Sequence, residues 1–245
     1  MDESRQRDLV DLRRRLQPDA AVAVLTGAGI SAASGIPTFR GKDDSLWARY
    51  RPQDLATCQA FARDPELVWR WYDWRRGLIA GSRPNAAHAA LTALAARTRL
   101  SLITQNVDGY HQQAGSRDVI EYHGSIWVVR CTRCRFQAED RRVPLPIPPR
   151  CPDCDALLRP GVVWFGEGIP PEAHRAAAAA AADCNVMLVI GTAGAVYPAA
   201  GLVDTARAHG AFVAEFNVES SAVTGRADLF ISGSAAETVP LLLDS

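Results

Sequence analysis

The sequence predicts an α/β protein in which helices cover both faces of a parallel sheet. Three observations support this prediction: short apolar runs recur along the chain, helix-like segments separate several of them, and a glycine-rich turn follows the first run. A continuous apolar run is typical of a parallel strand that is buried on both faces. Alternation of such strands with helices indicates a layered sheet.

The elements can be placed in order along the chain. Leu9, Leu12 and Leu16 have helical spacing, so residues 4–16 predict an amphipathic first helix. The predicted strands cover residues 21–26, 100–104, 119–122, 186–190, 211–216 and 228–231. The later predicted helices cover residues 85–97, 171–182, 198–209 and 236–243.

Two stretches interrupt this alternation. Residues 41–81 are rich in aromatic residues and arginine and have no strand pattern, which predicts a helical insertion. Residues 131–154 contain four cysteines and a proline-rich loop, and their composition fits neither sheet nor helix. We therefore expect a smaller lobe assembled from two separate pieces of the chain.

Composition excludes some functions. The 245 residues include 27 basic and 27 acidic side chains, so the formal net charge is zero, and 48% of the residues are hydrophobic. This hydrophobic content excludes disorder as the dominant state. The charge balance argues against a specific nucleic-acid partner. The charged N-terminus and the lack of a long apolar run predict a cytoplasmic protein without a membrane partner.

Four cysteines have the spacing of a metal site. Cys131 and Cys134 form one C-x-x-C pair, and Cys151 and Cys154 form another after sixteen residues. Four thiolates satisfy a tetrahedral zinc ion and leave no open position, so the site is expected to be structural. Two redox pairs remain the alternative, although disulfides are disfavoured in the cytoplasm. The remaining Cys58 and Cys184 are expected to be buried small hydrophobes.

The turn after the first predicted strand fits a relaxed dinucleotide-binding fingerprint. It reads Gly27-Ala28-Gly29-Ile30-Ser31-Ala32, in which glycines allow the backbone to approach a pyrophosphate and a helix N-terminus follows. The signal is weak alone, because no acidic residue stands about 20 positions later to bind a ribose. Residues 34–40 add an aromatic side chain and a cation beside the proposed phosphate site.

Further motifs follow along the chain. In order the full set is Gly27–Ser31, Gly35–Arg40, Thr104–Asp108, His123–Ser125, the four cysteines, Phe165–Glu167 and Gly191–Thr192. Taken together, these motifs resemble those of the sirtuins. The resemblance extends from about residue 21 to 243. It implies an NAD-dependent protein-lysine deacylase with NAD as cosubstrate, one structural zinc ion and acylated-lysine proteins as substrates.

The resemblance also implies how the chain is divided. A single catalytic domain would occupy residues 1–245. Its Rossmann-like large lobe would comprise about residues 1–40, 86–128 and 160–245. Its small lobe would comprise a helical module at about residues 41–85 and a zinc module at about residues 129–159.

The resemblance assigns catalytic roles to three residues. His123 matches the general base that activates a ribose hydroxyl, and an imidazole suits this role because its pKa lies near operating pH. Asn106 and Asp108 match the motif that lines the nicotinamide pocket. A local alternative for Asp108 is an N-cap of the following helix, and both roles are compatible. His111 lies close enough to this motif to be near the cofactor.

The resemblance implies a larger set of NAD-binding residues. On the phosphate and nicotinamide side they are Gly27, Ala28, Gly29, Ser31, Ala32, Pro37, Thr38, Phe39, Arg40, Gln105, Asn106, Val107 and Asp108. On the adenosine side they are Gly191, Thr192, Ala193, Asn217, Glu219 and Ala235. Ala193 departs from the family, which usually has serine there, and the missing hydroxyl contact is worth about 1 kcal/mol.

The substrate side is also implied by the resemblance. The acylated peptide would pair as a strand with the segment that contains Val163, Phe165, Gly166 and Glu167 and with the loop through Tyr197. Such main-chain pairing specifies the peptide sequence poorly.

Tyr72 and Arg75 resemble the Tyr-x-x-Arg pair of the sirtuin class that removes succinyl, malonyl and glutaryl groups. On a helix they share a face, and a guanidinium can bind a terminal carboxylate bidentately. Without the family context, an amphipathic helix with solvated arginines would be the better interpretation. Pro52 departs from the alanine usual in this class. We expect weaker activity on acetyl groups.

Other functions remain open alternatives. The chain could be a non-catalytic module that binds NAD or ADP-ribose, or a mono-ADP-ribosyltransferase that cleaves the same cofactor. A hydride-transferring dehydrogenase is disfavoured, because the acidic ribose-binding residue is missing.

Overall fold

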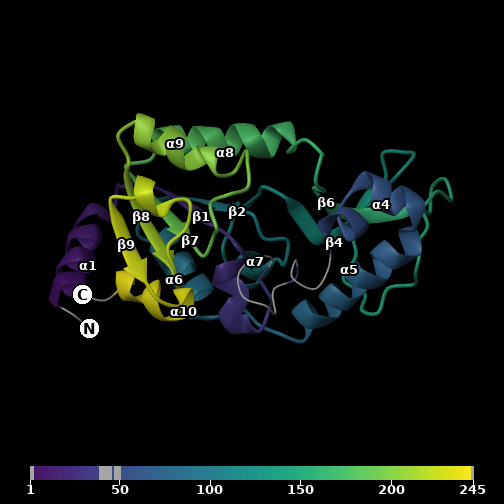
Figure 1. The fold of residues 1–245 in the computed structure, drawn as a ribbon, viewed down its shortest axis with the longest axis horizontal. Coiled ribbons are helices and arrows are strands. Elements are labelled where there is room, and N and C mark those ends of the chain that lie inside the picture. Colours follow the sequence, from purple (N-terminus) through teal and green to yellow (C-terminus); the bar gives the residue numbers. More distant parts are fainter. Residues whose placement is uncertain (1–2, 39–45, 47–50, 244–245) are drawn as a thin grey trace.

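The computed structural model describes residues 3–38, 46 and 51–243 of the chain, and two sheets organise this part. The larger sheet has six strands in the order β3-β2-β1-β7-β8-β9, and all of its pairings are parallel. The smaller sheet has three antiparallel strands in the order β5-β4-β6. The two sheets lie in different halves of an elongated molecule (Figure 1).

The predicted strands are confirmed to within one residue at each end. The strands of the larger sheet are β1 Ala21–Thr26, β2 Arg99–Thr104, β3 Ile120–Glu121, β7 Val186–Ile190, β8 Phe212–Asn217 and β9 Leu229–Ser232. Every residue of β1 and β7 is buried, as expected of central strands that are covered on both faces.

The helices of this half are α1 Glu3–Arg15, α6 Ala86–Ala95, α7 Tyr110–Gln113, α8 Pro171–Asp183, α9 Gly201–Ala208 and α10 Ala235–Thr238, with the 3-10 turns η2 Thr224–Arg226 and η3 Pro240–Leu243. One predicted helix, residues 236–243, is divided into α10 and η3. The division falls at Pro240, whose missing N–H and ring disfavour a continuous α-helix. Helix α9 starts three residues later than predicted, because residues 198–200 form a turn.

Alternate residues of each central strand face opposite layers of helices. Val22 and Val24 of β1 belong to a core with α1, α6 and α10, whereas Ala23 and Leu25 belong to a core with α8 and α9. Figure 1 shows α8 and α9 together along one side of the sheet and α6 and α10 on the other. This arrangement confirms the predicted α/β architecture with helices on both faces.

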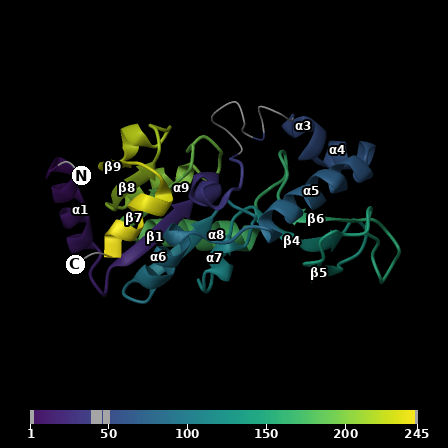
Figure 2. The same ribbon diagram turned by 90° about the horizontal axis from the view of Figure 1, so that it is seen from below.

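The helical module of the smaller half contains α3 Pro52–Leu55, α4 Cys58–Arg63 and α5 Pro65–Ala80, as the composition predicted. Helix α5 begins at a strong start signal: the Asp64 carboxylate accepts a hydrogen bond from the N–H of Leu67 at 2.9 Å, and Pro65 follows it. Figure 2 shows α5 lying along the small sheet.

The small sheet consists of β4 Gly124–Cys131, β5 Gln137–Glu139 and β6 Leu158–Val162. The expectation that residues 131–154 contain no sheet is wrong, because β5 lies within them. Strand β5 has only three residues, of which the outer two are exposed, so it leaves no readable pattern. Strand β4 begins before residue 129 and β6 ends after residue 159, so the small sheet extends beyond the proposed zinc module at both ends. The lobe boundaries stay a prediction.

Within the described ranges, no helix is both long and apolar enough to cross a membrane.

Candidate active site

The order of the parallel strands indicates where a ligand binds. Strands β2 and β3 lie on one side of β1, and β7, β8 and β9 lie on the other, so the strand order reverses between β1 and β7. In open α/β sheets, ligands bind beyond the carboxyl ends of the strands at such a reversal. The glycine turn after β1 and the Gly191-Thr192 turn after β7 flank this point.

These two turns touch through their backbones. The N–H of Gly29 donates to the carbonyl oxygen of Gly191 at 2.8 Å. A Cβ on Gly29 would lie 2.7 Å from the Gly191 Cα, and a Cβ on Gly27 would lie 2.7 Å from the Thr192 Cβ. Gly191 also has a φ of +60°, which disfavours other residues. The glycines therefore allow the two turns to pack together, in addition to their expected approach to phosphate.

The segment after Gly27 is a seven-residue 3-10 helix, η1 Ala28–Ser34, at the place where the sequence predicted a helix N-terminus. Ala28, Gly29, Ser31 and Ala32 all lie in η1, and Pro37 and Thr38 follow it. Phe39 and Arg40, also predicted to contact NAD, lie outside the described residues.

Three predicted residues form one buried hydrogen-bonded group. The Ser31 hydroxyl donates to the Asp108 carboxylate at 2.8 Å, and the Asn106 side-chain amide donates to the carbonyl oxygen of Gly27 at 3.0 Å. The N–H of Tyr110 donates to the other Asp108 oxygen at 3.0 Å. Gly109 occupies the N-cap position of α7, so Asp108 assists the helix start from one residue earlier. Burial raises the pKa of Asp108. Its hydrogen bonds and the charge of Arg75 partly oppose this shift.

The neighbouring residues connect this group to the other turn. The Gln105 side chain donates to the Thr192 hydroxyl at 3.0 Å, and the Asn217 side chain donates to the Thr192 carbonyl oxygen at 3.0 Å. The predicted NAD-binding residues after β1, β2, β7 and β8 thus lie around one edge of the sheet. Val107 is buried beside them, and its carbonyl oxygen accepts from the N–H of Ile126.

The outer predicted residues lie at the ends of this edge. Ala193 and Glu219 are exposed, and Ala235 is buried at the first position of α10. Amide, hydroxyl and backbone groups arranged beyond a strand reversal are a donor set suited to a dinucleotide, so these residues fit NAD.

His123 is oriented by its neighbour. Its Nδ1 lies 3.0 Å from the carbonyl oxygen of Gln105. A carbonyl oxygen only accepts hydrogen bonds, so Nδ1 carries the proton and the neutral ring keeps a lone pair on Nε2. Burial lowers the pKa of His123, which favours this neutral form near pH 7. The geometry suits a general base.

The four predicted metal ligands converge. The Sγ atoms of Cys131 and Cys154 are 3.5 Å apart, those of Cys134 and Cys151 are 3.6 Å apart, and all four lie within 4.8 Å of one another. A tetrahedral zinc site with Zn–S bonds of about 2.3 Å needs sulfur atoms roughly 3.8 Å apart. The cysteines are free thiols, so they fit one structural zinc ion and not two disulfides.

The two remaining cysteines differ. Cys184 is buried, as predicted. The expectation that Cys58 is buried is wrong: it is exposed at the first turn of α4, where its thiol donates to Glu167 at 3.2 Å. The exposure of Cys58 depends on how the start of α4 meets the segment around Glu167, a long-range contact that the residue type does not indicate.

The predicted acyl-binding pair lies on α5, on its buried side. Tyr72 is 2% exposed and Arg75 is 7% exposed, so the alternative of solvated arginines is excluded at Arg75. The Arg75 guanidinium lies 4.9 Å from the ring centroid of Trp71 and 5.8 Å from that of Tyr72. Burial lowers the pKa of Arg75, and attraction to Tyr72 and Asp108 opposes this shift. Pro52 begins α3 and is half-buried.

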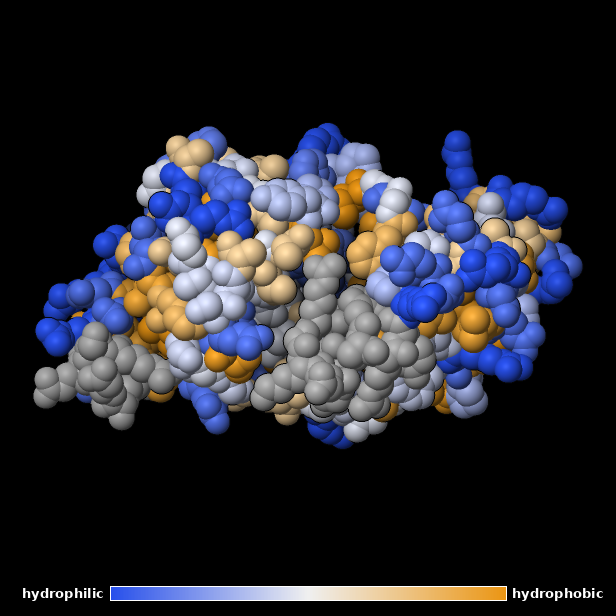
Figure 3. Space-filling model, in the orientation of Figure 1, coloured by the Kyte–Doolittle hydropathy of each residue, from blue (hydrophilic) through white to orange (hydrophobic). Residues whose placement is uncertain are grey.

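The predicted peptide-binding segment follows β6. The N–H of Val163 donates to the carbonyl oxygen of His123 at 2.9 Å. The N–H of Phe165 donates to the carbonyl oxygen of Ala56 at 2.9 Å. The Gly166 N–H has no hydrogen-bond partner among the described residues. Phe165 is 43% exposed and Tyr197 is 69% exposed. Figure 3 shows hydrophobic surface near the middle of the molecule, between its two halves.

Glu167 is held within this segment by charge. Its carboxylate accepts from Arg159 at 2.6 and 2.8 Å and from the N–H of Trp164 at 2.8 Å. Burial raises its pKa, but these hydrogen bonds outweigh burial and lower the pKa to about 2. Glu167 therefore anchors the turn, and its side chain is not available to a peptide.

The sequence analysis assigned no role to several residues of the site. Thr26 and Thr104, the last residues of β1 and β2, share a hydrogen bond of 2.8 Å, and the N–H of Asn106 donates to Thr104 at 3.1 Å. The Thr26 hydroxyl also lies 3.0 Å from His111 Nε2. A threonine at the end of each apolar run was the available signal. Trp164 lies within the predicted peptide-binding segment, but its hydrogen bond to Tyr72, 92 residues away, gave no signal in the sequence. Arg159 was not singled out.

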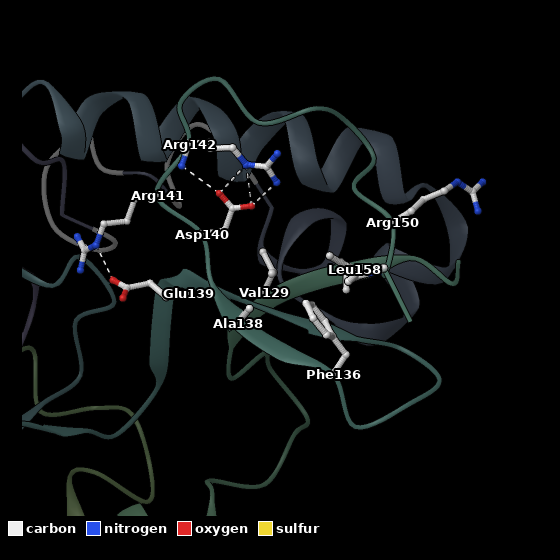
Figure 4. Close-up of a pocket in the computed structure, with 10 residues that line it drawn as sticks. Val129, Phe136, Ala138, Glu139, Asp140, Arg141, Arg142, Arg150 and Leu158 are labelled. Atoms are coloured by element: carbon white, nitrogen blue, oxygen red, sulfur yellow. Dashed lines mark hydrogen bonds and ion pairs between the residues drawn. The ribbon is translucent and has the colours of Figure 1, made fainter. Parts of the chain in front are cut away.

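A separate surface pocket lies on the small sheet (Figure 4). Val129, Phe136 and Leu158 form its apolar part. Its acidic groups are already paired, Asp140 with Arg142 at 2.6 Å and Glu139 with Arg141. The pocket shares no lining residue with the catalytic set, so it is not the candidate active site.

The fold and the site define a class of protein. The Sir2 family model matches residues 27–198, and the chain belongs to this family, the sirtuins. The resemblance inferred from the motifs is thereby confirmed.

Particular relatives are similar over nearly their full length. The chain is 54% identical to NAD-dependent protein deacylase 2 of Pyrobaculum aerophilum over 90% of this chain and 89% of the relative. It is 50% identical to an NAD-dependent protein deacylase of Aquifex aeolicus, over 91% of this chain and 94% of the relative.

Solved structures agree. A complex of a Sir2 homologue with NAD superposes with a TM-score of 0.89 at 45% identity, covering 96% of this chain and 92% of that one. Sir2 bound to an acetylated peptide superposes with a TM-score of 0.84 at 30% identity, covering 96% of this chain and 95% of that one.

Proposed function

We propose that this chain, an NAD-dependent protein deacylase of the Sir2 family, prefers acidic acyl groups on lysine: succinyl, malonyl and glutaryl. Acetyl groups would be removed more weakly. The observation that carries the preference is the buried guanidinium of Arg75, next to Tyr72 on α5 and within electrostatic reach of Asp108. A buried cation favours an anionic acyl group over a neutral one, because charge interactions strengthen away from water.

The catalytic residues would act through the bonds described above. NAD, when bound, supplies the nicotinamide–ribose bond that is broken. With one water consumed, the products would be nicotinamide, 2'-O-acyl-ADP-ribose and the free lysine amine. His123, with a free Nε2 lone pair, would accept a proton from a ribose hydroxyl. Asn106 and Asp108, held by Gly27 and Ser31, would orient the nicotinamide end and stabilise developing positive charge.

The substrate protein would bind as an extended segment beside Gly166 and Tyr197. Two observations support this role: the N–H of Gly166 has no partner in the part of the chain that the structure describes, and the side chains of Phe165 and Tyr197 are exposed. A main-chain interaction of this kind accepts many sequences. Acylated-lysine segments of several proteins are therefore expected as substrates.

The decisive experiment compares one peptide in acetyl-, succinyl-, malonyl- and glutaryl-lysine forms, with and without NAD, by mass spectrometry. Faster NAD-dependent loss of the acidic groups supports the proposal, whereas equal or faster loss of acetyl contradicts it. Binding of NAD without nicotinamide release would favour a non-catalytic module, and ADP-ribose attached to protein would favour a mono-ADP-ribosyltransferase.

A further inference from the structure

Trp164 contacts Tyr72, one member of the proposed acyl-binding pair. Its indole Nε1 is 2.9 Å from the Tyr72 hydroxyl oxygen, and both side chains are 2% exposed. The contact joins the segment after β6 to the middle of α5, 92 residues earlier in the chain. Sequence spacing gives no indication of it.

The direction of this hydrogen bond is fixed by chemistry. An indole nitrogen only donates, so the Tyr72 oxygen must accept. The single phenolic proton must then point to a different partner, because the indole N–H occupies one lone-pair direction. A carboxylate only accepts, which makes it a suitable partner for that proton.

Resting on the acyl preference proposed above, the geometry points to Trp164 as a specificity-determining residue: its indole N–H directs the Tyr72 proton toward the terminal carboxylate of the acyl group. Trp164 is a positioning residue, since it acts through Tyr72. Its ligand class is an acyl chain that ends in a carboxylate.

Two side chains contact the indole ring, and a third residue holds the backbone of Trp164. The Arg159 guanidinium lies 3.5 Å from its ring centroid, and the Phe61 ring centroid lies 5.4 Å away. Its own backbone N–H donates to Glu167, which also binds Arg159. These contacts prevent rotation of the indole away from Tyr72.

The protonation state of Tyr72 suits this role. Burial raises the pKa of Tyr72, and Arg75 and the Trp164 hydrogen bond only partly oppose the shift. The phenol therefore keeps its proton at neutral pH. A phenolate would repel a carboxylate, whereas the neutral hydroxyl donates to it.

The test is Trp164→Phe, which keeps an aromatic ring against Arg159 and removes the N–H. We expect the ratio of kcat/KM for a succinyl-lysine peptide to that for the matching acetyl-lysine peptide to fall on the order of tenfold, mainly through KM. Replacement of Trp164 by benzothienylalanine, which has the same shape without the N–H, should give the same fall and guards against misfolding.

Trp69→Phe is the matched control. Trp69 lies in the same core, and its indole donates to the carbonyl oxygen of Leu158 at 2.8 Å, away from Tyr72. This variant should lose stability without changing the acyl ratio. A ratio lowered equally by both variants would make the effect structural and overturn the inference.

A double-mutant cycle completes the test. In a Tyr72→Phe background, Trp164→Phe should cause no further fall in the ratio, because its effect passes through the phenol. An undiminished further fall would overturn the inference. If the wild-type enzyme prefers succinyl-lysine and Trp164→Phe leaves that preference intact, the inference alone fails. If the wild-type enzyme shows no such preference, the proposed function fails as well.

Discussion

The imidazole rings of His88 and His111 lie 4.9 Å apart between their centroids, and neither side chain is more than 1% exposed. His88 Nδ1 accepts a hydrogen bond from the N–H of Asn85. His111 Nε2 lies 3.0 Å from the hydroxyl oxygen of Thr26, the last residue of β1. Burial lowers the pKa of His88 to about 4. Burial and the neighbouring His88 lower that of His111 to about 3. Both rings are therefore neutral near pH 7.

This pair should make the protein sensitive to acid. An unfolded histidine titrates near 6.5, so between pH 6.5 and about 4 the unfolded chain binds more protons than the folded chain. Above pH 6.5 neither ring lowers the stability of the folded protein. Below pH 6.5 each ring lowers the free energy of unfolding by about 1.4 kcal/mol per pH unit, until the folded ring also gains a proton. Denaturant titrations from pH 7.5 to 5 should show this slope.

His111→Gln should reduce the slope by removing one titrating group. Identical slopes for the wild type and His111→Gln would refute the explanation.

The glycine contact at the strand reversal predicts the effect of one added methyl group. Gly29→Ala would place a Cβ 2.7 Å from the Gly191 Cα, so the two turns must separate. We expect a loss of about 1–3 kcal/mol in stability and weaker NAD binding, measured by denaturation and calorimetry. Gly168→Ala is the control, because nothing lies within 4 Å of its added Cβ. Equal effects of the two variants would argue against the contact.

Zinc removal should destabilise the half of the molecule that contains the small sheet. Cys131 is the last residue of β4, so a bound metal would link this strand to the other three cysteines. Metal binding would thereby stabilise the fold of this half. A chelator should lower Tm, and added zinc should restore it. Cys131→Ser should reproduce the loss, whereas Cys58→Ser, outside the cluster, should not. An unchanged Tm after metal analysis confirms zinc loss would count against a structural role.

His123→Ala should lower kcat by roughly 10²–10⁴, the usual contribution of a general base. Because burial lowers the pKa of His123, the acid limb of the wild-type pH–rate profile should lie below pH 6.5, with activity falling as the ring gains a proton. His209→Ala, on the surface, serves as the control. Full activity of His123→Ala would remove this residue from the mechanism.

Arg75→Met should lower kcat/KM for succinyl-lysine by at least tenfold and affect acetyl-lysine much less, since a neutral acyl group does not need the charge. Arg70→Met is the matched control on the same helix, because Arg70 is exposed and pairs with Glu66. The acyl assignment would be abandoned if Arg75→Met cleaved succinyl-lysine at the wild-type rate.

The sequence predicted features that arise from local periodicity and from motif spacing. The strand ends of the parallel sheet and the convergence of Cys131 with Cys154 are examples. It did not predict β5, which is too short for a pattern, or the exposure of Cys58, which depends on how α4 meets the segment around Glu167. It also missed the contact between Tyr72 and Trp164, because no local rule brings residues 72 and 164 together.

Tyr72 and Trp164 belong to the same buried cluster as Trp69 and Trp127, which forms the core of the small half of the molecule. The side chains proposed to select the substrate are therefore also packing residues. Mutations that alter acyl preference by changing the size of these rings will carry a cost in stability. Evolution toward another acyl group would then require compensating substitutions elsewhere in that core, and an engineer should introduce both kinds of change together.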